Sequence, residues 1–193
     1  MKSQIKSHWQ FHLAKVKDRL LINDTYLLIG GHLQIDGSMI RLNKTFIVTL
    51  KDEGIDWKEG PEITNERDSL MCGIMNKVKN RYAVVVGGIG HQGSLSDLCQ
   101  YLQLPYLTWK SCSNLPKGVA DGQLLTDPES GDLILIGGFS HGYERSILRL
   151  SSINDQWIEQ NVSLVAGRRS HTSMFVPDEQ LLCENTNLKH EEL

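Results

Sequence analysis

Short runs of β-branched and aliphatic residues recur along the chain, and three of them end in a pair of glycines. Apolar runs that are continuous rather than alternating are typical of strands buried on both faces. A tryptophan follows each pair, and a leucine lies seven residues before each of these three tryptophans. The glycine pairs and their tryptophans are Gly30 and Gly31 with Trp57, Gly87 and Gly88 with Trp109, and Gly137 and Gly138 with Trp157.

The pattern predicts a unit of four β-strands that is traversed about three times. In each unit a first strand and a polar turn precede the apolar run, which is expected to be the innermost strand. A third strand then ends at the leucine, and an outer strand carries the tryptophan. One turn, Asp-Pro-Glu-Ser-Gly at 127–131, has a physical basis because Pro fixes φ and Gly supplies a left-handed residue. The expected first strands are 69–75, 119–126 and 170–176, and the expected third strands are 45–50, 97–102 and 145–150.

The glycines and tryptophans are expected to serve packing. Glycine is needed where strands crowd together, because a side chain would clash there and because glycine also tolerates positive φ. The tryptophans are large anchors that would pack one unit against the next.

Over residues 20–185 the chain resembles the kelch-repeat β-propeller family, on the strength of these three glycine pairs, their apolar runs and their tryptophans. A period of about 50 residues is that of a kelch blade. The resemblance implies an all-β fold of four-stranded antiparallel blades, here an incomplete propeller of about three. Kelch repeats usually have tyrosine where this chain has Leu50, Leu102 and Leu150.

The repeat boundaries follow from the same alignment. The expected units are 20–66, 67–117 and 118–167, with a partial fourth unit at 168–185. Residues 1–19 are an N-terminal segment that could belong to a preceding blade, and 186–193 are expected to be a mobile tail. The fourth unit stops early, because Glu184 and Asn185 stand where a glycine pair should follow Leu181 and Leu182.

Three blades do not close a ring, since propellers of this kind have about four to eight. Two explanations are compatible with the sequence. The chain is a piece of a longer propeller protein, or two copies pair as a homodimer that builds a six-bladed ring. The interrupted fourth repeat favours the first explanation.

The net charge and the cysteines limit the classes of partner and cofactor that the chain is expected to bind. A formal net charge of −3 offers no general attraction for nucleic acid or an anionic membrane. The four cysteines form no CxxC pair, so we expect four reduced thiols in a cytoplasmic protein. Gly88–Gly93 reads GxGxxG, but no acidic residue lies between Asp97 and Asp121 and the same glycine arrangement recurs elsewhere, so no nucleotide or other cofactor is expected.

Polar residues gather in the loops that follow the glycine pairs. His32, His91 and His141 occupy equivalent positions there, but no carboxylate or thiol joins them at a metal-ligand spacing, so no metal site is expected. Arg67, Arg168 and Arg169 precede first strands, either as interface residues or as solvated strand starts. In kelch proteins these loops commonly line the mouth that binds a partner. The resemblance therefore assigns partner binding to His32, Gln34, His91, Gln92, Ser94, Ser140, His141 and Tyr143.

The sequence thus predicts a protein–protein interaction module with no catalytic residues. Kelch resemblance implies roles such as substrate capture for ubiquitin ligases or scaffolding. The alternative is a fragment of a kelch-fold enzyme, either galactose-oxidase-like or sialic-acid-isomerase-like. A copper oxidase should supply a crosslinkable cysteine near tyrosine and histidine, and the glycine-pair loops contain no cysteine.

Overall fold

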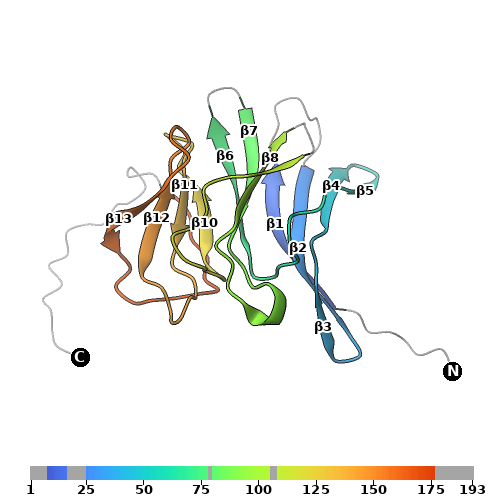
Figure 1. Ribbon diagram of the computed structural model, residues 1–193. Helices are drawn as coiled ribbons and strands as arrows, with labels where there is room; N and C mark the ends of the chain where they lie inside the picture. The colour runs from blue at the N-terminus through green and yellow to red at the C-terminus, as the bar shows by residue number, and fades with distance from the viewer. Residues whose placement is uncertain (1–7, 17–24, 78–79, 105–107, 177–193) are drawn as a thin grey trace, which may run out of the picture.

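A computed structural model describes residues 8–16, 25–77, 80–104 and 108–176 of the chain. These residues form three antiparallel sheets that stand side by side in an arc (Figure 1). In the described residues the only helical element is the short 3₁₀ turn η1 (His91–Gly93). The fold is therefore all-β, as expected.

Within each sheet, neighbouring strands succeed one another along the chain. The first has β1 (His8–Val16), β2 (Thr25–Ile35), β4 (Thr45–Lys51) and β5 (Gly54–Glu59), with β3 (Ser38–Arg41) paired to the far end of β2. The second has β6 (Met71–Lys77), β7 (Asn80–Val86), β8 (Cys99–Leu104) and β9 (Trp109–Ser111). The third has β10 (Gln123–Thr126), β11 (Leu133–Ile136), β12 (Ser146–Leu150) and β13 (Trp157–Ser163).

The strands of the second sheet fall within residues 67–117 and those of the third within 118–167, and three details differ from expectation. β1 pairs with β2, so residues 8–16 complete the first sheet and the boundary expected at residue 20 divides it. Residues 170–176, expected as the first strand of a fourth unit, form no strand. The interrupted glycine-pair strand at 181–185 and the tail 186–193 lie outside the described residues.

The innermost strand also differs from expectation. The first strands of neighbouring sheets contact one another, β6 lying against both β1 and β10, so they form the inner edge of the arc. The apolar runs of β7 and β11 are second in each sheet. The run in β7 is apolar throughout because neighbouring sheets cover both of its faces, whereas in β11 Leu133 and Leu135 are buried against the second sheet and Ile134 and Ile136 are half-buried on the other face.

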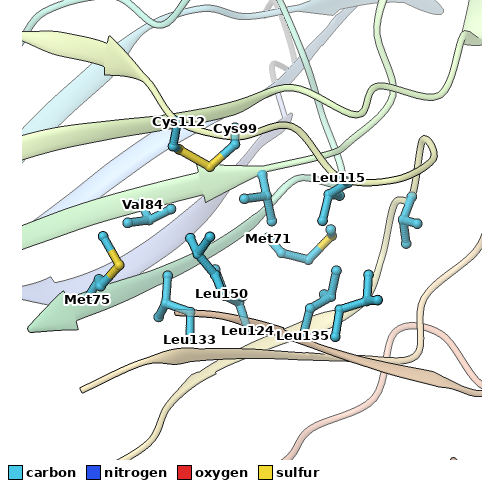
Figure 2. Close-up of a cluster of buried hydrophobic side chains, with 13 residues drawn as sticks. Met71, Met75, Val84, Cys99, Cys112, Leu115, Leu124, Leu133, Leu135 and Leu150 are labelled. Carbon is cyan, nitrogen blue, oxygen red and sulfur yellow. A yellow bond between two sulfur atoms is a disulfide. The ribbon is translucent and has the colours of Figure 1, made fainter. Parts of the chain in front are cut away.

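Two hydrophobic cores fill the spaces between the sheets. Alternate residues of β7 serve the two cores: Ala83 and Val85 pack toward the first sheet, and Val84 and Val86 toward the third. Figure 2 shows the second core, where Met71, Met75 and Val84 face leucines of the third sheet. The leucines labelled there from the third sheet are Leu124, Leu133, Leu135 and Leu150.

A disulfide joins Cys99 and Cys112 across β8 and the segment that follows β9 (Figure 2). The expectation of four reduced thiols is therefore wrong for this pair. The main-chain N–H of Cys112 donates to the Cys99 carbonyl at 3.0 Å, so the hairpin register places the two side chains together. Cys72 is a free thiol whose pKa is raised to about 12 by burial, and Cys183 lies outside the described residues.

The glycine pairs hold each sheet to the segment that enters the next. The N–H of Gly88 donates to the Val119 carbonyl at 2.8 Å, and Gly31 and Gly138 make the same bond to Arg67 and Arg168. A Cβ added at Gly87, which has φ +63°, would overlap the Val119 oxygen. Glycine is required because the next connector passes where a side chain would be.

Two of the three tryptophans anchor neighbouring sheets as predicted. The indole N–H of Trp109 in the second sheet donates to the Pro61 carbonyl of the first, at 3.0 Å. Trp157 in the third sheet donates to the Ser113 carbonyl of the second, at 2.9 Å. Trp57, in the first sheet, is 59% exposed, so no other described segment covers it as its equivalents are covered.

Candidate functional site

The loops that follow the glycine pairs lie together at one end of the sheets, shown at the bottom of Figure 1. Because strands alternate in direction, the β2–β3 hairpin, the β7–β8 loop and the β11–β12 loop all reach this end, which we call the loop face. The polar turns β10–β11 and β12–β13 lie at the opposite end. The sequence-predicted site residues all belong to segments of the loop face.

The structure does not present these residues equally. His91, Gln92 and Ser94 are exposed in the β7–β8 loop, where Gln92 has a left-handed backbone with φ +52°. The Ser94 hydroxyl donates to the His91 carbonyl at 2.9 Å, which tightens this turn. His141 and Tyr143 are exposed in the β11–β12 loop, but Ser140 is only 4% exposed and has little surface to offer a partner.

In the first sheet, the two predicted residues lie in a strand rather than a loop. β2 continues past its glycine pair and forms a hairpin with β3, pairing His32 with Arg41 and Gln34 with Met39. Gln34 is exposed at this hairpin, whereas His32 is half-buried. The hairpin therefore extends the loop face beyond the other two sheets.

A cleft of about 720 Å³ opens on the loop face between the first and second sheets. A smaller hollow of about 210 Å³, lined by Met39, Ile40 and Arg41, shares Glu66 and His91 with it. The cleft residues are mostly polar: Asn43, Asn65, Glu66, Arg67, Gly90, His91, Ser94, Ser96, Asp97 and Leu98. Two predicted residues, His91 and Ser94, thus belong to the cleft wall.

Arg67 at the cleft is 1% exposed, so it is neither a solvated strand start nor an exposed interface residue. Its guanidinium donates to the carbonyls of Gly87 at 2.9 Å and Leu98 at 3.2 Å, and to the Gln100 side-chain oxygen at 2.9 Å. Burial lowers the pKa of Arg67 to about 10. In the described chain its bonds go to neutral oxygens, and its Nε is buried without a hydrogen-bond partner.

Beside the cleft, Asp68 lies between two basic side chains. Its carboxylate is 3.1 Å from Arg41 Nε and 3.6 Å from His32 Nδ1. The Asp68 side chain is 6% exposed, and its Oδ1 has no hydrogen-bond partner in the described residues. Asp68 therefore fixes the β2–β3 hairpin against the connector that enters the second sheet, and its Oδ1 is buried there.

A second polar group lies on the loop face at the third sheet. The Arg169 guanidinium lies over the rings of Phe139 at 5.0 Å and Tyr143 at 5.6 Å, and 3.8 Å from the Asp121 carboxylate. Tyr143 is 62% exposed, so this cation–aromatic stack presents a surface that a partner could reach. Arg169 thus supports a predicted residue, Tyr143, from the connector after the third sheet.

The loop face carries mainly polar and charged groups around its cleft. Within the described ranges, no cluster of three His, Cys, Asp or Glu residues could hold a metal ion. The described helical segments include none that is long and apolar enough to cross a membrane. What the face does offer is amide, hydroxyl, imidazole and charged groups around an open cleft.

Sequence reasoning missed several residues of the site. Arg41 and Asp68 were not singled out, and they lie together only because β3 folds back on β2. Asp121 was also missed, although its backbone conformation is the same as that of Ser69 and Ser170. All three have positive φ, and main-chain bonds link Ser170 to Asp121 and Asp121 to Ser69.

Comparisons with known proteins support the fold. Searches against protein-family models and against curated protein sequences each found no match. Among solved structures, the chain is similar to the "Structure of YjhT", with a TM-score of 0.57 and 18% sequence identity. The match covers 77% of this chain and 45% of that chain, so this chain spans less than half of its length. At this identity the similarity concerns the fold.

Proposed function

We propose that this chain is a three-bladed part of a kelch-type β-propeller, and that its loop face recognises a protein partner. The three sheets supply the blades, each with a glycine pair that holds the next connector. The kelch-like spacing of glycines and tryptophans supports the family, and the stacked antiparallel sheets are consistent with a propeller.

The observation that carries the proposal is the polar cleft beside His91 and Ser94. Asn43, Asn65 and Ser96 add amide and hydroxyl groups, which can exchange hydrogen bonds with a polar peptide segment. Tyr143, stacked on Arg169, adds an exposed aromatic of the kind enriched in protein interfaces. The cleft and the stack lie at the same end of the sheets, so one partner can contact both.

The test is a capture experiment with the intact chain and two triple variants. In the first, His91, Gln92 and Tyr143, all exposed on the loop face, become alanine. In the matched control, Ile153, Asn154 and Gln156, all exposed in the β12–β13 turn at the opposite end, become alanine. Quantitative mass spectrometry compares the proteins bound by each, and circular dichroism confirms folding.

We expect the loop-face variant to lose a specific set of proteins that the wild type and the control both retain. Loss of interface anchors typically weakens binding by at least about ten-fold. If all three proteins capture the same partners equally, recognition does not use these loops and the proposal is wrong.

A further inference from the structure

The two interfaces between sheets are built in the same way. Each sheet has a tryptophan face, which carries the tryptophan and the leucine seven residues before it, and an opposite face. The tryptophan face of the second sheet, with Ala83, Val85 and Leu102, packs on Leu27 and Ile29 of the first. The tryptophan face of the third sheet, with Leu133, Leu135 and Leu150, packs on the opposite face of the second.

The indole hydrogen bond repeats with the same register. The acceptors are the carbonyls of Pro61 and Ser113. Each lies two residues before a residue whose main-chain N–H bonds to the segment that precedes the third long strand of its sheet. These residues are Ile63, which donates to the Asn43 carbonyl, and Leu115, which donates to the Asp97 carbonyl. The third sheet repeats this last bond, from Leu164 to Arg145, so its equivalent acceptor position is Val162.

The first sheet presents a tryptophan face that no other described segment covers. Trp57 is 59% exposed, Ile55 57% and Leu50 39%. The residue that pairs with the tryptophan is Val48 in this sheet, which is 7% exposed, and Leu102 and Leu150 in the other two, which are fully buried. Cross-strand pairing of Leu50 with Ile55, and of Val48 with Trp57, puts these side chains on one face, where all but Val48 are exposed.

The third sheet presents the complementary opposite face. Ile134 and Ile136 lie one residue out of phase with Leu133 and Leu135, so they point away from the second sheet. Ile134 pairs across the strands with Arg149, and Arg149 pairs with Ile158, so the three side chains share this face. Ile158 is 51% exposed. Val162, at the acceptor position, is 65% exposed.

We propose that a second copy of this chain covers both faces. The tryptophan face of the first sheet of one copy packs on the opposite face of the third sheet of the other. In this contact the Trp57 indole N–H donates to the main-chain carbonyl of Val162 in the second copy. Two-fold symmetry makes the two junctions identical, and the two arcs close into a ring of six sheets.

The second copy is favoured as the occupant because this chain carries both halves of an interface that it already uses twice internally. Length agrees as well. The part that matches YjhT is 45% of that chain, so two arcs of three sheets correspond to nearly its whole length. In the proposed ring, β1 of the second copy takes the position next to the third sheet that β6 and β10 hold next to theirs. Residues 171–176, which form no strand, therefore run beside that β1.

The first experiment measures the solution mass of the intact chain by light scattering on a sizing column. We expect a mass of about twice 21.8 kDa at tens of micromolar. Ile158→Glu should raise the dimer dissociation constant at least about 100-fold, because it buries an unpaired charge at both junctions. Ile153→Glu is the matched control, since Ile153 is 88% exposed in a turn rather than on the sheet face, and it should stay dimeric.

A mixing experiment distinguishes loss of dimerisation from misfolding of the variants. Trp57→Lys and Ile158→Glu should each be monomeric alone, yet form a heterodimer when mixed. The mixed ring has one unaltered junction and one in which the introduced ammonium of the first variant faces the introduced carboxylate of the second. A wild-type chain that is monomeric, an Ile153→Glu variant that dissociates like Ile158→Glu, or two variants that do not associate would each overturn the proposal.

Discussion

At the residue scale, the glycine pairs are explained by one close approach. The first glycine leaves room for the carbonyl of the next connector, and the second donates its N–H to that same carbonyl. Gly87→Ala should therefore lower the free energy of unfolding by more than about 3 kcal/mol, because the new Cβ meets the Val119 oxygen. Urea unfolding followed by circular dichroism measures this change.

Gly93 provides the matched control for that substitution. It also has positive φ, at +77°, but a Cβ added there meets nothing within 4 Å. Gly93→Ala should cost only the left-handed backbone strain, about 1 to 2 kcal/mol. Equal losses in the two variants would mean that backbone conformation, rather than the connector carbonyl, accounts for the glycine pair.

Asp132 gives the chain a pH-dependent contribution to stability. Burial alone would raise the pKa of Asp132, but hydrogen bonds from Ser152 and Arg149, both at 2.7 Å, outweigh it and lower the pKa below the usual 3.8. A lowered folded-state pKa means that the stabilisation is complete above pH 3.8 and is lost as the pH falls through the folded value.

Asp132→Asn should thus be less stable than the wild type by about 2 kcal/mol at pH 7. This difference should shrink as the pH falls below 3.8. Denaturant midpoints measured between about pH 7 and pH 2.5, with the exposed Asp52→Asn as a control, test both statements. A difference that stays constant with pH would show that the charge on Asp132 does not contribute.

At the element scale, the disulfide closes the outer hairpin of the second sheet. The two cysteines are 13 residues apart, and both side chains lie in the core between the second and third sheets. Changing both Cys99 and Cys112 to alanine should lower the free energy of unfolding by about 2 to 4 kcal/mol. Thermal unfolding measures this, with reductant on the wild type as a second route to the same loss.

Cys72→Ala is the control for the disulfide, because that thiol is free and its removal leaves the cross-link in place. We expect reductant to destabilise Cys72→Ala as it does the wild type, and to leave the double alanine variant unchanged. A wild type that is insensitive to reductant would contradict a stabilising disulfide.

The strands were predictable because burial on both faces leaves an unmistakable apolar run, such as Ala83–Val86. The disulfide was not, because it depends on the register of β8 with β9, and spacing along the chain does not contain that register. Arg67 shows the same limit. A buried arginine and a solvated one look alike in sequence, and only the carbonyls of Gly87 and Leu98 decide between them.

At the scale of the whole molecule, the glycine pairs align the three sheets and so set the loop face. Because each sheet is held to the next connector, the β7–β8 and β11–β12 loops keep a fixed relation, and so do the cleft and the Tyr143 stack. The expected blade-like arrangement depends on this coupling, which repeats from Gly31 to Arg67, from Gly88 to Val119 and from Gly138 to Arg168.

The most direct test is amide hydrogen exchange, resolved by residue with NMR. The amides of Gly31, Gly88 and Gly138 should exchange as slowly as those of Val84 and Val85 in the middle of β7, because all three are held in the cooperative structure. If these glycine amides instead exchange as fast as those of the exposed η1 turn, the sheets are not held together through their glycine pairs, and the arc is not one unit.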